Sequence, residues 1–311
     1  MRVFVTGASG YMGSAIVPEL IKAGHHVIGL ARSDESAKSI EAAGAEVLRG
    51  NLEDLETLKA GVAKADGVIH LAFIHDFSIY AQAAATDRLA LETIGNELVD
   101  SGKPFIMTSG TMMLPHGSLG TEETLPDMTH PMTSLRGKNE AVALAFASRG
   151  VCVSVIRLPP TVHGENDHGF VHRTISIARE KGVSAYIEGQ HRWSAVNRLD
   201  AARVYVLALE KAIAGSVFHA VAEEGVPTQE IAEAIGKQLH LPVVTMSFEE
   251  AQAHFGFVAF LFNADNAVSS KQTQEKLDWH PTQAGLIKDI EQGHYFKDNE
   301  QKTYFKERRV D

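Results

Sequence analysis

Short apolar runs alternate with amphipathic stretches through the first half of the chain. The apolar runs have the length of strands, and they predict β-strands at residues 3–6, 26–30, 45–48, 67–71, 104–107 and 151–156. The stretches between them repeat apolar residues at helical spacing, which predicts helices at residues 15–21, 36–43, 54–63, 80–101 and 135–148. Strands that alternate with helices over short connections are typical of an α/β fold with a parallel sheet covered on both faces.

The alternation loosens after Leu158, where Pro159 and Pro160 interrupt the chain. The polar stretch 163–172 reads as a loop. Further helices are predicted at 200–214, 228–239 and 282–290, with Asp200 as the N-cap of the first, and one more strand at 216–221. We therefore expect a dinucleotide-binding domain made of residues 1–160 and 195–222, and a smaller C-terminal α/β substrate lobe made of residues 161–194 and 223–311.

A glycine-rich turn joins the first predicted strand to the first predicted helix. It reads Thr6-Gly7-Ala8-Ser9-Gly10-Tyr11-Met12-Gly13. Glycines permit a tight turn and a close approach of backbone to a diphosphate, whose charge the free amides of the helix start would hold. The pattern predicts a Rossmann-type, doubly wound parallel sheet that binds a dinucleotide through Gly7, Ser9, Gly10, Tyr11, Met12 and Gly13.

The end of the second strand indicates which dinucleotide is preferred. An acidic residue there would bind the ribose 2′-hydroxyl of NAD, but this chain has Arg32 and Ser33. A guanidinium pairs well with a 2′-phosphate. We therefore expect NADP(H) to be favoured over NAD(H). The alternatives are a solvated Arg32 or one that stacks on adenine without discriminating.

Composition narrows the range of partners. The net charge is −10 and there is one cysteine in 311 residues. The negative charge argues against nucleic acid and anionic membranes as main partners. No stretch reads as a membrane span or secretion signal, so we expect a cytoplasmic protein that acts on a small molecule.

These motifs resemble those of the short-chain dehydrogenase/reductase superfamily, in its extended and atypical branch, whose members are often labelled epimerase/dehydratase-like. The glycine spacing belongs to that branch, and the resemblance extends over nearly the whole chain. It implies cofactor contacts from Asn51 and Leu52, from Leu71, Ala72 and Phe73, and from Leu158, Pro159 and Pro160. It also implies a substrate contact from Ser109 or Thr111, and which of the two points inward stays open.

The main departure concerns the superfamily's Tyr-x-x-x-Lys motif. In the matching segment Ser134 stands where the tyrosine is expected and Lys138 where the lysine is expected. The resemblance implies that Lys138 holds the nicotinamide ribose. A serine hydroxyl is too short and too weakly acidic to replace the tyrosine. Among His163, His168 and His172, an imidazole could act as the general acid, and we take His163 as the first candidate. Their irregular spacing argues against a metal site.

The resulting hypothesis is an NADP(H)-dependent oxidoreductase that acts on a small carbonyl or alcohol. Two alternatives remain: a non-catalytic protein that senses the nicotinamide pool, and a nucleotide-sugar epimerase or dehydratase. The resemblance also implies a homodimer formed through the helices predicted at 80–101 and 135–148.

Overall fold

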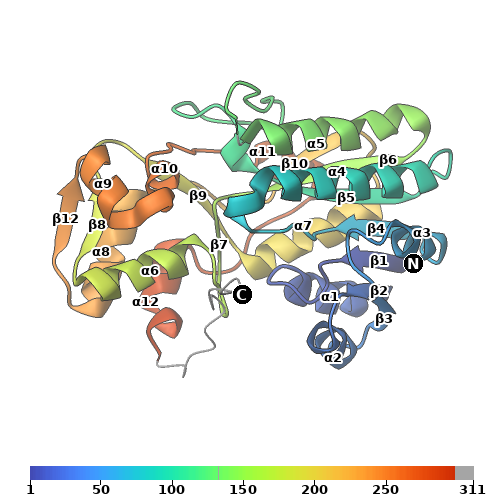
Figure 1. The fold of residues 1–311 in the computed structure, drawn as a ribbon, viewed down its shortest axis with the longest axis horizontal. Coiled ribbons are helices and arrows are strands. Elements are labelled where there is room, and N and C mark those ends of the chain that lie inside the picture. The colour runs from blue at the N-terminus through green and yellow to red at the C-terminus, as the bar shows by residue number, and fades with distance from the viewer. Residues whose placement is uncertain (132, 298–311) are drawn as a thin grey trace.

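A parallel sheet of seven strands forms the larger part of the molecule (Figure 1). The computed structural model describes residues 1–131 and 133–297. In spatial order the strands are β10 (Ser216–His219), β6 (Cys152–Leu158), β5 (Pro104–Gly110), β4 (Gly67–His70), β1 (Arg2–Thr6), β2 (His26–Ala31) and β3 (Glu46–Arg49). Every neighbouring pair is parallel. The Rossmann-type α/β fold predicted from the sequence is confirmed.

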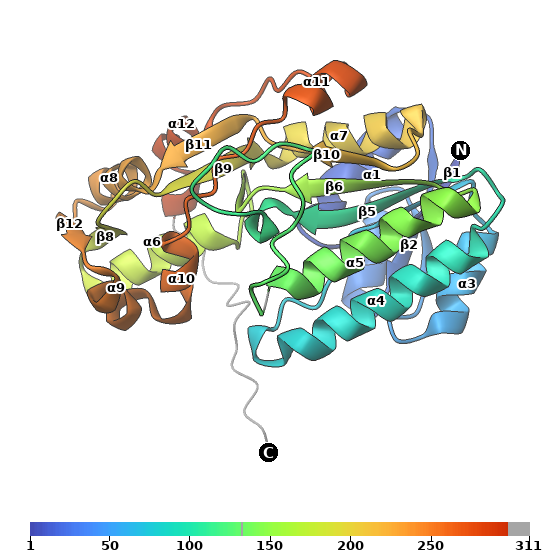
Figure 2. The same cartoon turned by 90° about the horizontal axis from the view of Figure 1, so that it is seen from above.

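Helices cover both faces of this sheet (Figure 2). One face packs against α1 (Gly13–Lys22), α2 (Asp34–Ala42) and α7 (Arg198–Lys211). The other packs against α3 (Leu55–Ala63), α4 (Tyr80–Glu97) and α5 (Thr133–Ala145). The strand order reverses between β1 and β4, so a crevice is expected beyond their carboxyl ends, where doubly wound sheets bind ligands.

A second lobe lies beyond that edge of the sheet (Figure 1). Its strands form a three-stranded and a two-stranded sheet: β7 (Thr161–His163), β9 (Arg192–Asn197) and β11 (Glu223–Pro227), and β8 (Ser184–Ile187) and β12 (Val243–Met246). Its helices include α6 (Phe170–Lys181), α8 (Thr228–Leu239), α9 (Phe248–Phe255), α10 (Ala259–Phe262) and α12 (Leu286–Glu291). A separate apolar core around Trp193 holds it together. A further helix, α11 (Lys271–Leu277), contacts α7 and β10.

Two expectations for the second half are corrected. The segment 163–172 is only partly a loop, because His163 ends β7 and His172 lies in α6. Asp200 is not an N-cap: Asn197 caps α7, and its side chain accepts from the amide of Leu199. The buried Asp200 carboxylate instead accepts from the amides of Thr282 and Gln283, which ties α7 to the segment that precedes α12.

Residues 195–197 were expected in the dinucleotide-binding domain, but they belong to β9, which pairs with strands of the second lobe. Among residues 1–131 and 133–297, none of the helices combines the length and the apolar character that a membrane crossing requires.

Candidate functional site

The three glycines of the turn after β1 are needed for different structural reasons. Gly7 has φ +71°, and a Cβ there would come within 2.9 Å of the Ala72 amide nitrogen. A Cβ on Gly13 would collide with the Gly7 carbonyl oxygen, so this glycine lets α1 pack on the turn. Gly10 is exposed, and a Cβ there meets only the Gly7 oxygen at 3.2 Å. Packing within the protein therefore demands Gly7 and Gly13, whereas a Cβ on the exposed Gly10 would have this one tight backbone neighbour and no other within 4 Å.

The same turn presents backbone donors without acceptors. Across the described part of the chain, the amides of Tyr11 and Met12 have no hydrogen-bond partner. The first turn of α1 carries no acidic residue and no side-chain cap. Ser9 is half-buried beside them. Free amides at the positive end of a helix dipole fit a diphosphate, so the residues present fit the expected dinucleotide.

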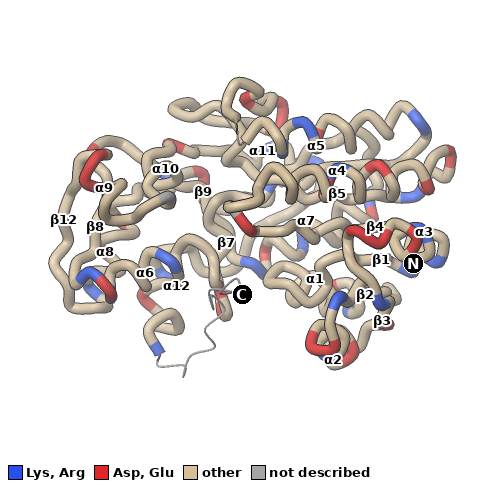
Figure 3. Tube along the Cα trace, viewed as in Figure 1, with Lys and Arg blue, Asp and Glu red and all other residues tan. Residues whose placement is uncertain are grey.

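Two cations lie near the ends of β2 and β3, next to the acidic first turn of α2 (Figure 3). Arg49 is engaged, since its guanidinium donates to the Ser33 carbonyl oxygen at 2.5 Å and pairs with Asp34. Arg32 is exposed and has no partner among the described residues. The Ser33 hydroxyl caps α2 by accepting from the amide of Ser36 at 3.2 Å. Arg32 is therefore the free positive charge at this edge.

Asn51 and Leu52 follow β3 at the same edge. Leu52 is buried, whereas Asn51 is exposed. The Asn51 side-chain oxygen accepts from the amides of Glu53 and Asp54, at 2.8 and 3.2 Å. Its NH2 group remains available to an adenine ring.

A buried hydrogen-bonded chain runs from β1 to α4 beneath the crevice. The Ala72 amide donates to the Thr6 hydroxyl at 3.3 Å, and that hydroxyl lies 2.8 Å from His70 Nδ1. His70 Nε2 lies 3.1 Å from Asp87 Oδ1, and Asn139 Nδ2 donates to Asp87 Oδ2 at 2.7 Å. Burial alone would raise the pKa of Asp87, but these hydrogen bonds and a nearby guanidinium outweigh it and lower the pKa. Asp87 therefore carries a buried negative charge.

That guanidinium belongs to Arg136 on α5. Arg136 Nη1 lies 3.7 Å from Asp87 Oδ2, and Nη2 donates to the Thr108 carbonyl oxygen at the end of β5, at 2.8 Å. The guanidinium carbon lies 4.1 Å from the ring centroid of Phe73, which follows β4. Leu71, Ala72 and Phe73 are all half-buried here. Arg136 thus bridges the carboxyl ends of β4 and β5.

Two other ionisable side chains lie beside the Phe73 ring. The rings of His75 and Tyr80 meet it edge to face, at 5.2 and 5.8 Å between centroids. Surrounding protein atoms, and then the Arg136 charge, lower the pKa of His75. Burial raises the pKa of Tyr80, although the Arg136 charge opposes this. The sequence analysis had not singled out Tyr80 or Arg136.

The two hydroxyls expected to meet substrate have different surroundings. Thr111 is fully buried, and its hydroxyl donates to Asn266 Oδ1 at 2.7 Å, which ties the sheet to the second lobe. Ser109 is also buried, but its hydroxyl has only a weak contact with Met113 Sδ at 3.7 Å. Of the two, Ser109 keeps a hydroxyl that is not committed to a strong bond.

His163 departs from the expectation that it could act as a general acid. It is fully buried, and its Nδ1 lies 2.7 Å from Asp289 Oδ2. Asp289 also pairs with His294 at 3.0 Å. The imidazole therefore ties β7 to the C-terminal helices, because its ring is enclosed and reaches no solvent. His168, in contrast, is exposed.

The segment after β7 closes over the glycine turn. The hydroxyl of Tyr11 lies 3.5 Å from the Gly164 carbonyl oxygen, its ring meets His168 edge to face at 5.4 Å, and Arg198 lies over it at 4.9 Å. Burial raises the pKa of Tyr11 far above its ordinary value. Before this segment, Leu158 and Pro160 are half-buried and Pro159 is buried. Both lobes therefore contribute to the crevice.

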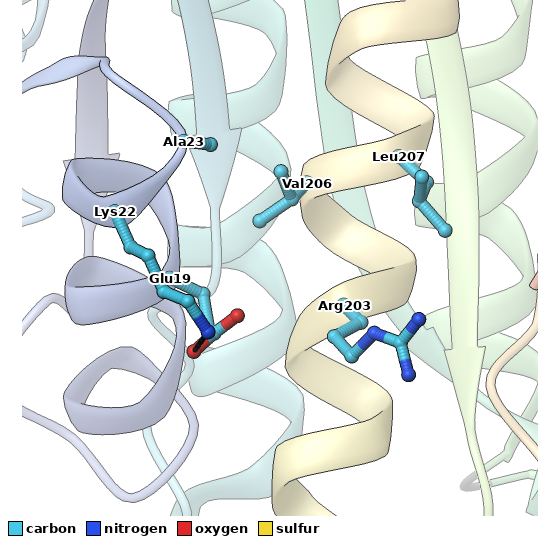
Figure 4. A pocket seen from close by; sticks show the side chains of 6 residues that line it. All are labelled: Glu19, Lys22, Ala23, Arg203, Val206 and Leu207. Carbon is cyan, nitrogen blue, oxygen red and sulfur yellow. Dashed lines mark ion pairs between the residues drawn. The ribbon is translucent and has the colours of Figure 1, made fainter. Parts of the chain in front are cut away.

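A hollow of about 240 Å³ between α1 and α7 lies elsewhere (Figure 4). Glu19 and Lys22, which pair at 3.6 Å, and Arg203 line it together with apolar side chains. Glu19 and Lys22 belong to the second half of α1, remote from the glycine turn at its amino end, so the hollow is separate from that turn.

The comparison with protein families matches residues 3–221 to the NAD dependent epimerase/dehydratase family. This chain belongs to that family. A relative from Schizosaccharomyces pombe, the uncharacterized protein C2A9.02, is 52% identical over 95% of this chain and 100% of its own. A 4-hydroxy-2-methyl-3-oxo-4-farnesyl-3,4-dihydroquinoline-1-oxide ketoreductase from Stigmatella aurantiaca is 29% identical over 70% of this chain and 67% of its own.

Solved structures agree on the fold of this family member. The dTDP-glucose 4,6-dehydratase DesIV from Streptomyces venezuelae, which has NAD and TYD bound, superposes with a TM-score of 0.78. The two share 17% identity over 96% of this chain and 98% of that one. The chain is therefore an NAD(P)-dependent epimerase/dehydratase-type Rossmann protein.

The orientation of α5 departs from the sequence-based expectation for this family member. Asn139, Glu140 and Ala143 are buried, and Glu140 forms a buried pair with Arg157 of β6 at 2.5 Å. This pair directs Arg136, one turn earlier, toward the sheet edge and leaves Lys138 exposed. Counting four residues back from Arg136 reaches Met132 instead of a tyrosine.

Ser134 and Lys138 were expected to share one face of α5, but their surroundings differ. Ser134 is buried, and its hydroxyl has only a long contact of 3.4 Å with the Pro131 carbonyl oxygen. Lys138 has no hydrogen bond or ion pair within the described ranges. Arg136 could be located only once the structure showed that Glu140 is buried, since a buried acid needs a fixed partner and so sets the rotation of the helix.

Proposed function

We propose that this protein is an NADP(H)-dependent oxidoreductase that interconverts a small carbonyl compound and its alcohol. The observation that carries the proposal is the glycine turn. There an exposed Gly10 and the free amides of Tyr11 and Met12 offer space and donors to a diphosphate. The unpaired Arg32 supports a 2′-phosphate. The name of the ketoreductase relative supports a reductase.

In this proposal the bound cofactor supplies the hydride, and the chain positions it. Gly7, Ser9 and Gly13 complete the diphosphate cradle, Arg32 and Ser33 meet the 2′-phosphate, and Asn51 and Leu52 meet the adenine. The nicotinamide half lies against the segments 71–73 and 158–160, in which all residues except the buried Pro159 are half-buried. Ser109 contacts the substrate oxygen. Thr111 and His163 receive no part in the reaction, because the Thr111 hydroxyl is bonded to Asn266 and the His163 ring is fully enclosed by protein.

The absent tyrosine supports a second candidate function, that of a protein which binds the cofactor to sense the nicotinamide pool. Four residues before Arg136 the chain has Met132, whose thioether donates no proton. Such a protein would bind NADPH tightly without consuming it.

Binding and turnover together test these functions. The dissociation constants of NADPH and NADH are measured by nicotinamide fluorescence, and NADPH consumption is then followed with a panel of aldehydes and ketones. We expect NADPH to bind more tightly and to be oxidised. Tight binding without turnover would support the sensor. Tightly retained NAD together with a nucleotide-sugar product would indicate an epimerase or dehydratase, and absence of dinucleotide binding would refute all three.

A homodimer is part of the same proposal. Helices α4 and α5 lie side by side on the outside of the sheet (Figure 2), and Leu89 on α4 is 54% exposed. Light scattering should give twice the chain mass for the protein and the chain mass for Leu89→Arg. A monomeric wild type would refute the dimer.

A further inference from the structure

We propose that Arg136 forms an oxygen-anion subsite in the crevice, which takes the carbonyl oxygen or an adjacent carboxylate of the substrate. The inference deepens the proposed oxidoreductase function and rests on it for the reaction, but the subsite itself is a property of Arg136. Neither the family match nor the Tyr-x-x-x-Lys pattern assigns this residue.

The guanidinium has donors to spare. It carries five N–H groups, of which one bonds the Thr108 carbonyl oxygen and one faces Asp87 at 3.7 Å. Among the described residues, the remaining donors, including that of Nε, have no acceptor. The side chain is 15% exposed, so it is largely shielded from water and retains some accessible surface. A partly desolvated guanidinium with free donors is suited to bind a planar oxygen anion.

The position of this charge is fixed by the groups around it. The Phe73 ring supports one face of the guanidinium at 4.1 Å, which is a cation–π contact. On its other side the buried Asp87 carboxylate is held by Asn139 and by His70, and His70 is held by Thr6 under the glycine turn. Arg136 is therefore pre-organised at the carboxyl ends of β4 and β5, the edge of the sheet at which doubly wound folds bind their ligands.

A fixed guanidinium can also stabilise the substrate oxygen, which the tyrosine of the Tyr-x-x-x-Lys motif would otherwise do. During reduction the carbonyl carbon accepts hydride from the reduced nicotinamide, and the π electron pair of the C=O bond moves onto the oxygen. The N–H groups of Arg136 hold the resulting oxyanion until a solvent proton converts it to the hydroxyl, which leaves the cofactor oxidised. Arg136 needs no proton of its own to give up, because it stabilises charge through N–H donors that are already in place.

The test uses benzoate as a small carboxylate probe, titrated by calorimetry into the full chain with and without NADP⁺. The variants are Arg136→Gln and, as the matched control two residues along the same helix, Lys138→Gln. We expect benzoate binding to weaken at least about tenfold in Arg136→Gln and to change less than about twofold in Lys138→Gln. Binding of adenosine 2′,5′-bisphosphate, which lacks the nicotinamide half, should be equal in all three proteins and shows that the fold is intact.

Equal benzoate binding by Arg136→Gln and wild type would overturn the proposal, as would loss in Lys138→Gln instead. No benzoate binding by wild type in either condition would also overturn it. Should wild type fail to bind both NADPH and adenosine 2′,5′-bisphosphate, the proposed function would fail. The benzoate titration of the free protein would still decide the role of Arg136.

Discussion

At the scale of single residues, the three glycines of the phosphate turn should separate folding from binding. A Cβ on Gly13 collides with backbone, whereas one on Gly10 meets a single oxygen at 3.2 Å. We expect Gly10→Ala to shift the melting temperature by less than about 2 °C. It should nevertheless weaken NADPH binding by at least about tenfold, since the methyl group occupies the space of the diphosphate.

Gly13→Ala is the contrasting variant and should unfold the protein or lower its melting temperature by about 6 °C or more, because backbone must move. Thermal melts and fluorescence titration give both quantities. A Gly10→Ala protein that binds NADPH as wild type does would contradict a diphosphate at this turn.

Arg32 allows a prediction on cofactor choice. Because it is exposed and unpaired at the end of β2, replacing it removes a charge without disturbing packing. We expect Arg32→Asp to weaken NADPH binding by about a hundredfold, through the lost pair and the added repulsion of the 2′-phosphate, and to change NADH binding only slightly. Lys22→Asp, an equal change of charge at the far end of α1, serves as the control. Equal losses for both cofactors in Arg32→Asp would refute the preference.

The role of a residue could be predicted from the sequence where local backbone geometry determines that role. It could be predicted less well where the role depends on tertiary packing. The glycine turn follows from local spacing, since φ at Gly7 and the approach of Gly13 are set within a few residues. Lys138 was chosen because its residue type matched the expected lysine. The rotation of α5 depends instead on the buried Glu140–Arg157 pair, which forms only when α5 packs on β6.

At the scale of secondary structure elements, Asp200 shows how one side chain ties its helix to a segment distant in the sequence. It is 1% exposed, and it accepts hydrogen bonds from the amides of Thr282 and Gln283. Asp200→Ala removes this buried acceptor and leaves two part-buried amides without their partner, so we expect it to lower the free energy of unfolding by about 2–3 kcal/mol. Asp54→Ala, which removes the exposed N-cap of α3, should cost only about 1 kcal/mol. Urea denaturation measures both, and equal losses would contradict the anchoring role of Asp200.

The elements of the sheet were predictable because each strand is an apolar run and each helix has its own periodic face. The elements of the second lobe were harder to predict from the sequence. Val171, Ile175 and Ala178 do repeat at helical spacing in α6, but the preceding glycine and histidines obscured where this helix begins. Strands β8 and β12 have only four residues each and acquire a strand conformation by pairing with one another across most of the lobe.

At the scale of the whole molecule, a buried polar cluster joins the sheet to the C-terminal segment. Arg157 donates to Glu140 and to the carbonyl oxygen of Thr124, and it contacts His219 Nε2 at 3.2 Å. His219 Nδ1 lies 2.8 Å from the Ser269 carbonyl oxygen, so the neutral ring donates there and accepts from Arg157. The candidate site depends on this cluster, because the same Glu140–Arg157 pair orients Arg136.

This cluster predicts how stability depends on pH. Burial, and then the Arg157 charge, lower the pKa of His219 to about 3, whereas the unfolded chain protonates it near 6.5. Below pH 6.5 the unfolded state therefore binds a proton that the folded state refuses, so stability falls as pH decreases from about 6.5 toward 3. Between pH 7.5 and 5.5 this one group should lower the free energy of unfolding by about 1.4 kcal/mol.

The variant His219→Asn removes that contribution. The deficit in its free energy of unfolding, relative to wild type, should therefore be smaller at pH 5.5 than at pH 7.5 by about the same amount. Urea denaturation at both pH values measures the deficit, with Leu125→Ala, a change at an exposed side chain that does not titrate, as the control whose deficit stays constant. A deficit for His219→Asn that is equal at both pH values would mean that the folded protein accepts the proton on His219, and the neutral ring between Arg157 and Ser269 would have to be abandoned.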